Sequence, residues 1–178
     1  MDPTVLFERA ASGAVQVAGQ VRSDQWHAVT PCSEWDVTAL VAHMVAGTGY
    51  LMAAVGGDPG PLGVDASSYR AAIDTCVAAI RRPGALELRC LSPAGFEWSV
   101  AEAVAGTAMD QLVHTWDLAV AIGADETLDP ELAETCVALF VPQMPTLGRA
   151  AGFVGPEVPV PSEASAQHRL LGAMGRHP

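Results

Sequence analysis

The chain is poor in charged and aromatic residues. Charged residues make up 16% of its 178 residues and aromatic residues 6%, whereas hydrophobic residues reach 50%. Alanine, valine and leucine dominate this apolar share, which favours closely packed helices over a sheet of β-branched and aromatic strands. A chain of this length can bury a hydrophobic core without disulfides, so we expect a single domain over residues 1–178.

Basic residues are especially scarce. Only nine lysine and arginine residues stand against 20 aspartate and glutamate residues, and the formal net charge is -11. Such a chain repels a phosphate backbone or an anionic lipid surface, so we expect neither nucleic acid nor membrane as a partner. No run of about 18 uninterrupted apolar residues occurs, and acidic residues stand where a signal peptide would carry its basic segment. We therefore expect a soluble, cytoplasmic protein.

Several familiar motifs are absent as well. None of the cysteines shows the CxxC spacing of zinc ribbons and dithiol redox sites, so we expect four reduced, partly buried thiols at Cys32, Cys76, Cys90 and Cys136. No G-x-S-x-G, P-loop or Rossmann glycine pattern occurs. Nucleophile-elbow hydrolysis, phosphate cradling and dinucleotide binding therefore have no support.

Most of the chain has the apolar spacing of one helical face. Apolar residues recur every three or four positions over residues 5–23, 37–55, 66–82, 100–123 and 131–141, which predicts five helices, with a short sixth helix capped by Ser162. Asp36 and Ser99 are the expected N-caps of the second and fourth helices, and Glu102 completes a capping box. Residues 85–99 predict a short extended arm. The expected fold is an all-α bundle with this arm and a structured C-terminal tail.

The stretch DQLVHTWDLA, residues 110–119, contains a pair of side chains with ligand chemistry. Helical geometry places Asp110 and His114 one turn apart on one face, with side-chain roots about 5 to 6 Å apart, close enough to share a divalent ion. The same pair can equally form a hydrogen bond on the surface of a helix. The pair alone therefore leaves both interpretations open.

His43 adds a third candidate ligand from another helix. Its apolar neighbours predict burial, and a buried histidine needs a partner for each ring nitrogen. Helical bundles commonly build metal sites from facing helices, and His43, Asp110 and His114 would leave one coordination position open, as in catalytic zinc sites. Iron or nickel suits the same ligands. The alternative is a purely structural, hydrogen-bonded cluster of the three side chains.

Asp117 projects to nearly the same side of its helix as this pair. It can hold the free ring nitrogen of a histidine ligand and so fix the tautomer and orientation of the ring, or it can bond to backbone or solvent. Trp26 and Trp35 are expected to anchor the edge of the core rather than to contact a ligand. The remaining histidines are expected to be solvated surface groups: His27, His168 and His177.

Three segments together resemble a known family. They are TPCSEWDVTALVAHMV, with the signature W-D-V-x-x-L-x-x-H; DQLVHTWDLAVAIG, with H-x-W-D-L-A; and the closing GFVGPEVPVPSEASAQHRLLGAMGRHP. They resemble the actinobacterial DinB-like family that includes the metal-binding domain of mycothiol-dependent maleylpyruvate isomerase. The likeness covers nearly the whole chain. It implies a four-helix bundle that holds a divalent metal through His43, Asp110 and His114, with aspartate where the isomerase has glutamate.

The resemblance also implies a class of activity. It points to a metal-dependent S-transferase or isomerase that uses mycothiol as cosubstrate, with zinc as the first choice of metal and nickel or iron as alternatives. Coordination deprotonates a thiol whose pKa is otherwise about 8 to 9, and the thiolate would attack a small electrophile, while hydrolysis by bound water is the runner-up chemistry. The other alternative is a non-catalytic metal- or small-molecule-binding protein. Related bundles often pair through a helix face, which implies a homodimer.

Overall fold

The computed structural model describes residues 1–150 and 152–178, and these residues are mostly helical. They form two compact units, Met1–Glu126 and Thr127–Pro178, which are described in turn. The helical content confirms the predicted all-α class. The expectation of a single domain over residues 1–178 stays a prediction.

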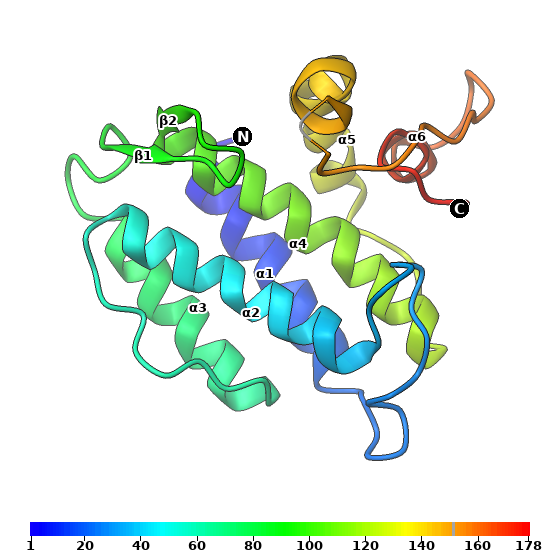
Figure 1. Cartoon of the computed structure of the whole chain (residues 1–178), viewed down its shortest axis with the longest axis horizontal. Coiled ribbons are helices and arrows are strands. Elements are labelled where there is room, and N and C mark those ends of the chain that lie inside the picture. Colours follow the sequence, from blue (N-terminus) through cyan, green and yellow to red (C-terminus); the bar gives the residue numbers. More distant parts are fainter. Residues whose placement is uncertain (151) are drawn as a thin grey trace. The chain divides into compact units, whose positions relative to one another are not determined.

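Four helices build the first unit: α1 (Pro3–Ala18), α2 (Val37–Ala54), α3 (Ala66–Ile80) and α4 (Val100–Ile122). α1 and α2 each pack against both α3 and α4, so the four helices close into a circuit (Figure 1). Full burial of a large apolar side chain contributes about 1.5 to 3 kcal/mol. The core of this unit contains such side chains from all four helices, among them Leu6, Phe7, Leu40, Met44, Leu51, Ile73, Ile80 and Leu118.

The ends of α1 and α3 differ from the predicted ones. The carboxylate of Asp2 accepts hydrogen bonds from the backbone N–H groups of Thr4 and Val5, so α1 begins at Pro3, and it ends at Ala18 rather than at residue 23. Local side-chain capping therefore moves the start of the helix ahead of its first apolar residue. α3 ends at Ile80, two residues before the predicted end.

The predicted extended arm is a short hairpin. β1 (Arg89–Leu91) pairs with β2 (Glu97–Ser99) in antiparallel fashion, with Cys90 opposite Trp98. The connecting turn contains Gly95 at a φ of +83°, in the region that favours glycine. The hairpin delivers the chain directly into α4, because Ser99 is both the last residue of β2 and the N-cap of α4.

α2 has the length and apolar composition of a helix that could cross a membrane. The core helix of a soluble protein passes the same test, since both bury apolar side chains. Here α2 packs against α3 and α4 and buries eight residues: Val37, Leu40, Val41, Met44, Val45, Thr48, Gly49 and Leu51.

The second unit contains α5 (Pro130–Phe140), a 3-10 helix η1 (Val141–Gln143), a π-helix η2 (Met144–Arg149) and α6 (Ala166–Ala173). α5 packs against α6, and Arg169 forms an ion pair with Glu134 between them. The predicted cap of the last helix was wrong. Ser165, not Ser162, accepts a hydrogen bond from the N–H of His168, because residues 161–164 are taken up by a turn.

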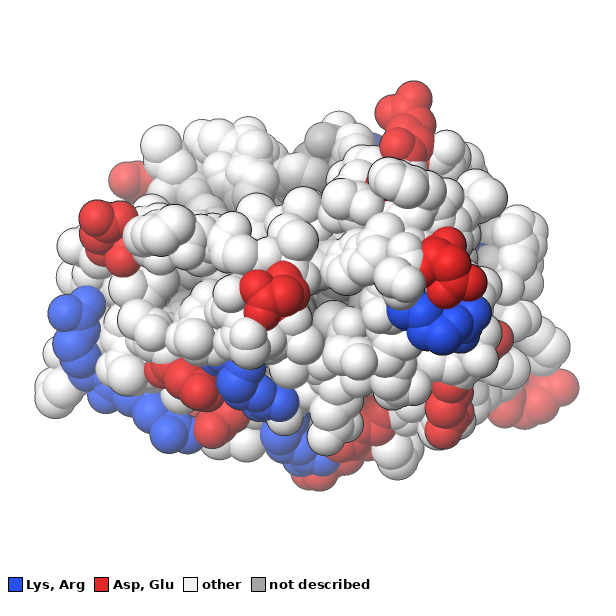
Figure 2. Space-filling model, turned by 90° about the horizontal axis from the view of Figure 1, so that it is seen from below, with Lys and Arg blue, Asp and Glu red and all other residues white. Residues whose placement is uncertain are grey.

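Charged side chains are thinly distributed on the face shown in Figure 2. Blue side chains run along the lower left of this face, and others further right lie beside acidic side chains. Two exposed ion pairs of the first unit join Arg81 to Glu8 at 2.5 Å and Arg22 to Asp24 at 3.4 Å. Exposed pairs of this kind contribute little to stability, typically below about 1 kcal/mol.

Candidate metal centre

Two helices supply the candidate ligands, and a side-chain cap fixes the start of each. In α4, Ser99 Oγ accepts from the N–H of Glu102, whose carboxylate accepts from the N–H of Ser99 in return. This helix ends at Gly123, whose φ is +69°. In α2, the carboxylate of Asp36 accepts from the N–H of Ala39 at 2.9 Å. The predicted N-caps of α2 and α4 and the end of α4 are confirmed.

A buried polar network sets the register of α2 against α4. Gln111 Nε2 donates to the carbonyl oxygen of Met44 at 2.7 Å, and the hydroxyl of Tyr69 donates to Gln111 Oε1. The helices approach closely at Gly47, where a Cβ atom would lie 3.2 Å from Gln111 Nε2 and 3.2 Å from a methyl carbon of Thr107. The network joins Met44, the residue after His43, to Gln111, the residue after Asp110. It therefore holds the two helices together directly beside a predicted ligand on each.

His43, Asp110 and His114 meet at this point. His43 Nε2 lies 3.2 and 3.3 Å from the two carboxylate oxygens of Asp110, and His114 Nε2 lies 3.3 Å from Asp110 Oδ1. One ligand atom from each residue can be chosen so that all three lie within 4.8 Å of one another. The structure therefore brings together the three residues that the sequence singled out.

The cluster is open on one side. The side chains of His43 and Asp110 are 38% and 35% exposed, whereas that of His114 is 10% exposed. The expectation that His43 is buried by its apolar neighbours was wrong, because those neighbours lie on the other faces of the helix. Solvent and small molecules can therefore reach the side of the cluster that His43 and Asp110 form.

The two acid–base partners on α4 shift each other's pKa. Desolvation raises the pKa of Asp110, but the neighbouring imidazoles of His114 and His43 outweigh it and hold that pKa well below its usual range. Burial lowers the pKa of His114, and the charge of Asp110 more than reverses this, together with hydrogen bonds to Asp110, Asp117 and Cys32. The pKa of His114 therefore lies well above 6.5, and without metal the pair favours imidazolium and carboxylate.

Asp117 contacts the opposite edge of the His114 ring. Its side chain is fully buried, and its Oδ2 accepts from His114 Nδ1 at 2.8 Å. A proton held on Nδ1 leaves the lone pair of Nε2 available on the side of Asp110. Of the two roles considered for Asp117, the structure shows the contact that orients the ring.

Two further residues of the cluster were missed by the sequence reasoning. Cys32 Sγ lies 3.3 Å from Asp117 Oδ2 and 3.8 Å from His114 Nδ1. The indole of Trp35 lies against both histidines, with ring centroids 4.6 Å from His43 and 5.6 Å from His114. Trp35 was expected only to anchor the core edge, and it also forms a wall of the candidate site.

The loop before α2 holds these two residues in place through short-range hydrogen bonds. Thr30 Oγ1 donates to the carbonyl oxygen of Trp35 at 2.8 Å and accepts from the N–H of Cys32 at 3.1 Å. The N–H of Trp35 in turn donates to the carbonyl of Cys32. Apolar residues in this loop show no regular spacing from which its structure could be predicted. The sequence did indicate that Cys32 and Trp35 could lie near His43, because TPCSEW stands just before the helix that carries this histidine.

The separations in the cluster fit a divalent ion. Zinc lies about 2.0 to 2.2 Å from nitrogen and oxygen ligands, so tetrahedral geometry sets such ligands about 3.3 to 3.6 Å apart. The distances of 3.2 to 3.3 Å from Asp110 to His43 and His114 lie at this edge length. Two imidazoles and one carboxylate also suit iron and nickel.

The same distances bear on the alternative of a structural, hydrogen-bonded cluster. A charge-assisted N–H···O hydrogen bond is about 2.7 to 2.9 Å long, as it is between His114 and Asp117. The contacts to Asp110 are longer, and His43 Nε2 is nearly equidistant from both oxygens. These contacts still lie within hydrogen-bonding distance, so the geometry around Asp110 suits both a shared ion and a hydrogen-bonded cluster of the three side chains.

The other histidines and thiols lie outside this arrangement. His27 is 89% exposed and pairs with Asp36 at 3.0 Å, and His168 and His177 are exposed, as predicted. All four cysteines lie in the described part of the chain, and none of them forms a disulfide there.

Comparison with known proteins gives relatives without an assigned activity. No family model and no solved structure matches the chain. Two uncharacterized proteins, from two strains of Mycobacterium tuberculosis, are each 32% identical to it over 184 residues. The alignments cover 99% of this chain and 98% of each relative. At this identity and coverage, the chain belongs to the family of these mycobacterial proteins.

Proposed function

We propose that the protein is a divalent-metal-dependent enzyme in which His43, Asp110 and His114 hold the metal and a small thiol is activated for attack on an electrophile. The observation that carries this proposal is the convergence of three ligand atoms from two helices within 4.8 Å of one another, with one side open. An open coordination position is typical of catalytic rather than structural metal sites.

The arrangement of the helices supports the resemblance to the DinB-like family. Four helices pack in a closed circuit, the second helix supplies one histidine, and the fourth supplies the acid and the other histidine. We propose on this basis a DinB-like four-helix bundle with the shorter aspartate at position 110. Zinc is the proposed metal, with nickel or iron as alternatives, and mycothiol the proposed cosubstrate in a cytoplasmic enzyme.

The residues of the cluster divide the work. When bound, the metal supplies charge that lowers the pKa of a coordinated thiol, so that it is ionised near neutral pH. Asp117 holds the proton of His114 on Nδ1 and thereby keeps Nε2 directed toward the ion. His43 and Asp110 border the open side, where thiol and electrophile can enter. The indole of Trp35 packs against both histidines. On the open side, the thiol would lose its proton to solvent, and its sulfur would form a bond to the electrophilic carbon as the bond from that carbon to its leaving group breaks.

The test is thiol conjugation by protein from which metal has been removed and then restored. We expect conjugation of mycothiol to small electrophiles to vanish on chelation and to return with zinc, nickel or iron. His43→Ala should stay inactive after metal is restored, whereas the matched control His27→Ala should behave as the wild type. Conjugation that survives chelation, or that His43→Ala retains, would disprove the proposal.

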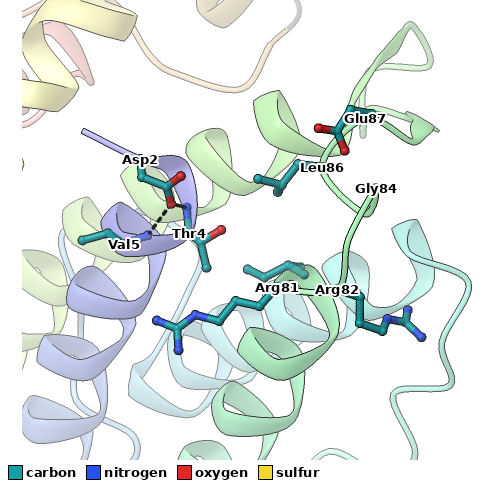
Figure 3. A pocket seen from close by; sticks show the side chains of 9 residues that line it. Asp2, Thr4, Val5, Arg81, Arg82, Gly84, Leu86 and Glu87 are labelled. Atoms are coloured by element: carbon teal, nitrogen blue, oxygen red, sulfur yellow. Dashed lines mark hydrogen bonds between the residues drawn. The ribbon is translucent and has the colours of Figure 1, made fainter.

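A second function has its own supporting observation. Two pockets in the described part of the chain, of about 280 and 260 Å³, are not lined by His43, Asp110 or His114. The larger lies at the start of α1 and the end of α3, where Asp2 already caps α1 (Figure 3). Neither of these two pockets adjoins the candidate ligands, which suits a non-catalytic metal-binding protein. Stoichiometric metal without thiol binding, measured by calorimetry, would favour this second function.

A further inference from the structure

His114 is flanked by a carboxylate at each ring nitrogen. Asp110 Oδ1 lies 3.3 Å from Nε2, and Asp117 Oδ2 lies 2.8 Å from Nδ1. A neutral imidazole carries one proton and offers one lone pair. Either tautomer therefore finds an acceptor: Asp117 when the proton is on Nδ1, and Asp110 when it is on Nε2.

A second set of ligand atoms lies on the Nδ1 side of the same ring. These atoms are Cys32 Sγ, His114 Nδ1 and Asp117 Oδ2, which lie within 4.8 Å of one another. The sulfur lies 3.8 Å from the nitrogen and 3.3 Å from the oxygen, and the nitrogen lies 2.8 Å from the oxygen. A tetrahedral ion with one sulfur ligand sets the sulfur about 3.5 to 3.7 Å from nitrogen and oxygen ligands. The two sulfur separations lie close to that range, while the nitrogen–oxygen pair would widen by about 0.5 Å.

The two sets differ in ligand chemistry. The first contains only nitrogen and oxygen atoms, whereas the second contains a thiol and a fully buried carboxylate. Thiolate ligands select soft ions such as Cd²⁺ and Cu⁺ and also bind zinc. His114 belongs to both sets, and its single lone pair can serve only one of them at a time.

We propose that Cys32, His114 and Asp117 form a second, thiophilic metal position that excludes occupancy of the first. The ion takes the place of the Cys32 thiol proton, which is released to solvent, and binds His114 at Nδ1. The ring then keeps its proton on Nε2, where Asp110 accepts it. A soft ion at this position withdraws His114 from the proposed catalytic set and would thereby switch off the enzyme. This regulatory effect rests on the proposed function. The existence of the second metal position does not rest on it.

The experiment is a titration of metal-free, full-length protein with Cd²⁺, followed by the sulfur-to-cadmium charge-transfer absorption in the ultraviolet. We expect this absorption in the wild type and in His43→Ala, which loses a ligand of the first set only. Cys32→Ser should abolish it and weaken cadmium binding at least about 100-fold, the upper end of what loss of a ligand's hydrogen-bond partner costs. Cys90→Ser, a change at the other half-buried cysteine, should retain it.

Circular dichroism of each variant, together with cadmium NMR of the wild type, separates lost ligation from lost folding. A wild-type cadmium resonance in the range of thiolate ligation supports the second position even if Cys32→Ser unfolds. Absorption that persists in Cys32→Ser overturns it. Zinc binding that depends on His43, without any cadmium–sulfur signal, overturns the second position and leaves the proposed function standing. Cadmium–sulfur binding at Cys32 without zinc binding at His43 supports the second position and overturns the proposed function.

Discussion

The first unit pairs a histidine with an aspartate in two places, at the start of α2 and within α4, and the two histidines differ greatly in exposure. Before the first turn, His27 contacts Asp36 at 3.0 Å with its side chain 89% exposed. At the facing α4, His114 contacts Asp117 at 2.8 Å with the two side chains 10% and 0% exposed. The same residue types thus form a solvated pair in one place and a desolvated one in the other.

The electrostatics follow from this difference. At the exposed pair, the hydrogen bond from His27 lowers the pKa of Asp36, and the chief structural role of that carboxylate is to cap α2. In the interior, the charge of Asp110 holds the pKa of His114 well above its usual range despite burial. Desolvated charges interact more strongly because water no longer screens them. Burial of both partners therefore sets the pair of His114 and Asp117 apart from the pair of His27 and Asp36.

The largest expected effect is the loss of the buried carboxylate. Asp117→Ala removes the acceptor of His114 Nδ1 and leaves a buried donor unpaired, so we expect the free energy of unfolding to fall by about 3 kcal/mol. Urea denaturation of the metal-free protein measures this. The same change at Asp36 removes an exposed pair and a helix cap and should cost less. Equal losses at both positions would contradict the contrast drawn between them.

A second prediction concerns the network beneath the candidate ligands. Tyr69→Phe deletes the hydroxyl that donates to Gln111 Oε1 and leaves a buried acceptor unsatisfied, so we expect a loss of about 2 kcal/mol in unfolding free energy. Phe replaces Tyr without a change in ring packing. Tyr50→Phe, at a half-buried tyrosine whose hydroxyl donates to the carbonyl of Leu91, is the matched control and should cost less.

A third prediction follows from the raised pKa of His114. In metal-free protein, its contribution to stability is fully present below its ordinary pKa of 6.5 and is lost as pH rises through the higher folded value. Metal binding needs the unprotonated ring, so affinity should rise with pH by up to about tenfold per unit over the same range. Thermal melts of metal-free protein and metal titrations across neutral pH should therefore change in opposite directions. Parallel changes would refute the assignment.

The smallest expected effect is at the exposed pair. His27→Ala removes a ring that is 89% exposed and pairs with the carboxylate of Asp36, which caps α2. We expect the urea midpoint and the metal affinity to match those of the wild type. A clear loss of metal from this variant would place the loop histidine in the site and erase the distinction between the two places.

The parts of this molecule that depend on local sequence were predictable. The capping box of Ser99 and Glu102, the cap at Asp36 and the stop at Gly123 all use side-chain or backbone chemistry within a few residues. The predicted cap at Ser162 was wrong because two nearby serines can both cap a helix. The turn over residues 161–164 places Ser165, not Ser162, at the start of α6. Helix periodicity also placed Asp110 on one face of α4, beside its neighbours in the cluster.

The parts that depend on long-range packing were not predictable. Cys32 lies on a loop without periodicity, and its contact with Asp117 spans much of the chain. The exposure of His43 was misjudged because apolar neighbours in sequence occupy the other faces of its helix. Helical spacing and the family resemblance both pointed to His43, Asp110 and His114 as candidate ligands, but only the packed helices show that Asp110 lies between both histidines.

The central claim is that His43, Asp110 and His114 hold a divalent metal. Its most direct test is the metal content and zinc affinity of untagged wild-type protein, His43→Ala and the control His27→Ala. We predict one tightly bound ion per chain in the wild type and in His27→Ala, and binding weakened at least about 100-fold in His43→Ala. A wild-type protein that binds no stoichiometric metal, or a His43→Ala protein that binds it equally well, would contradict the account.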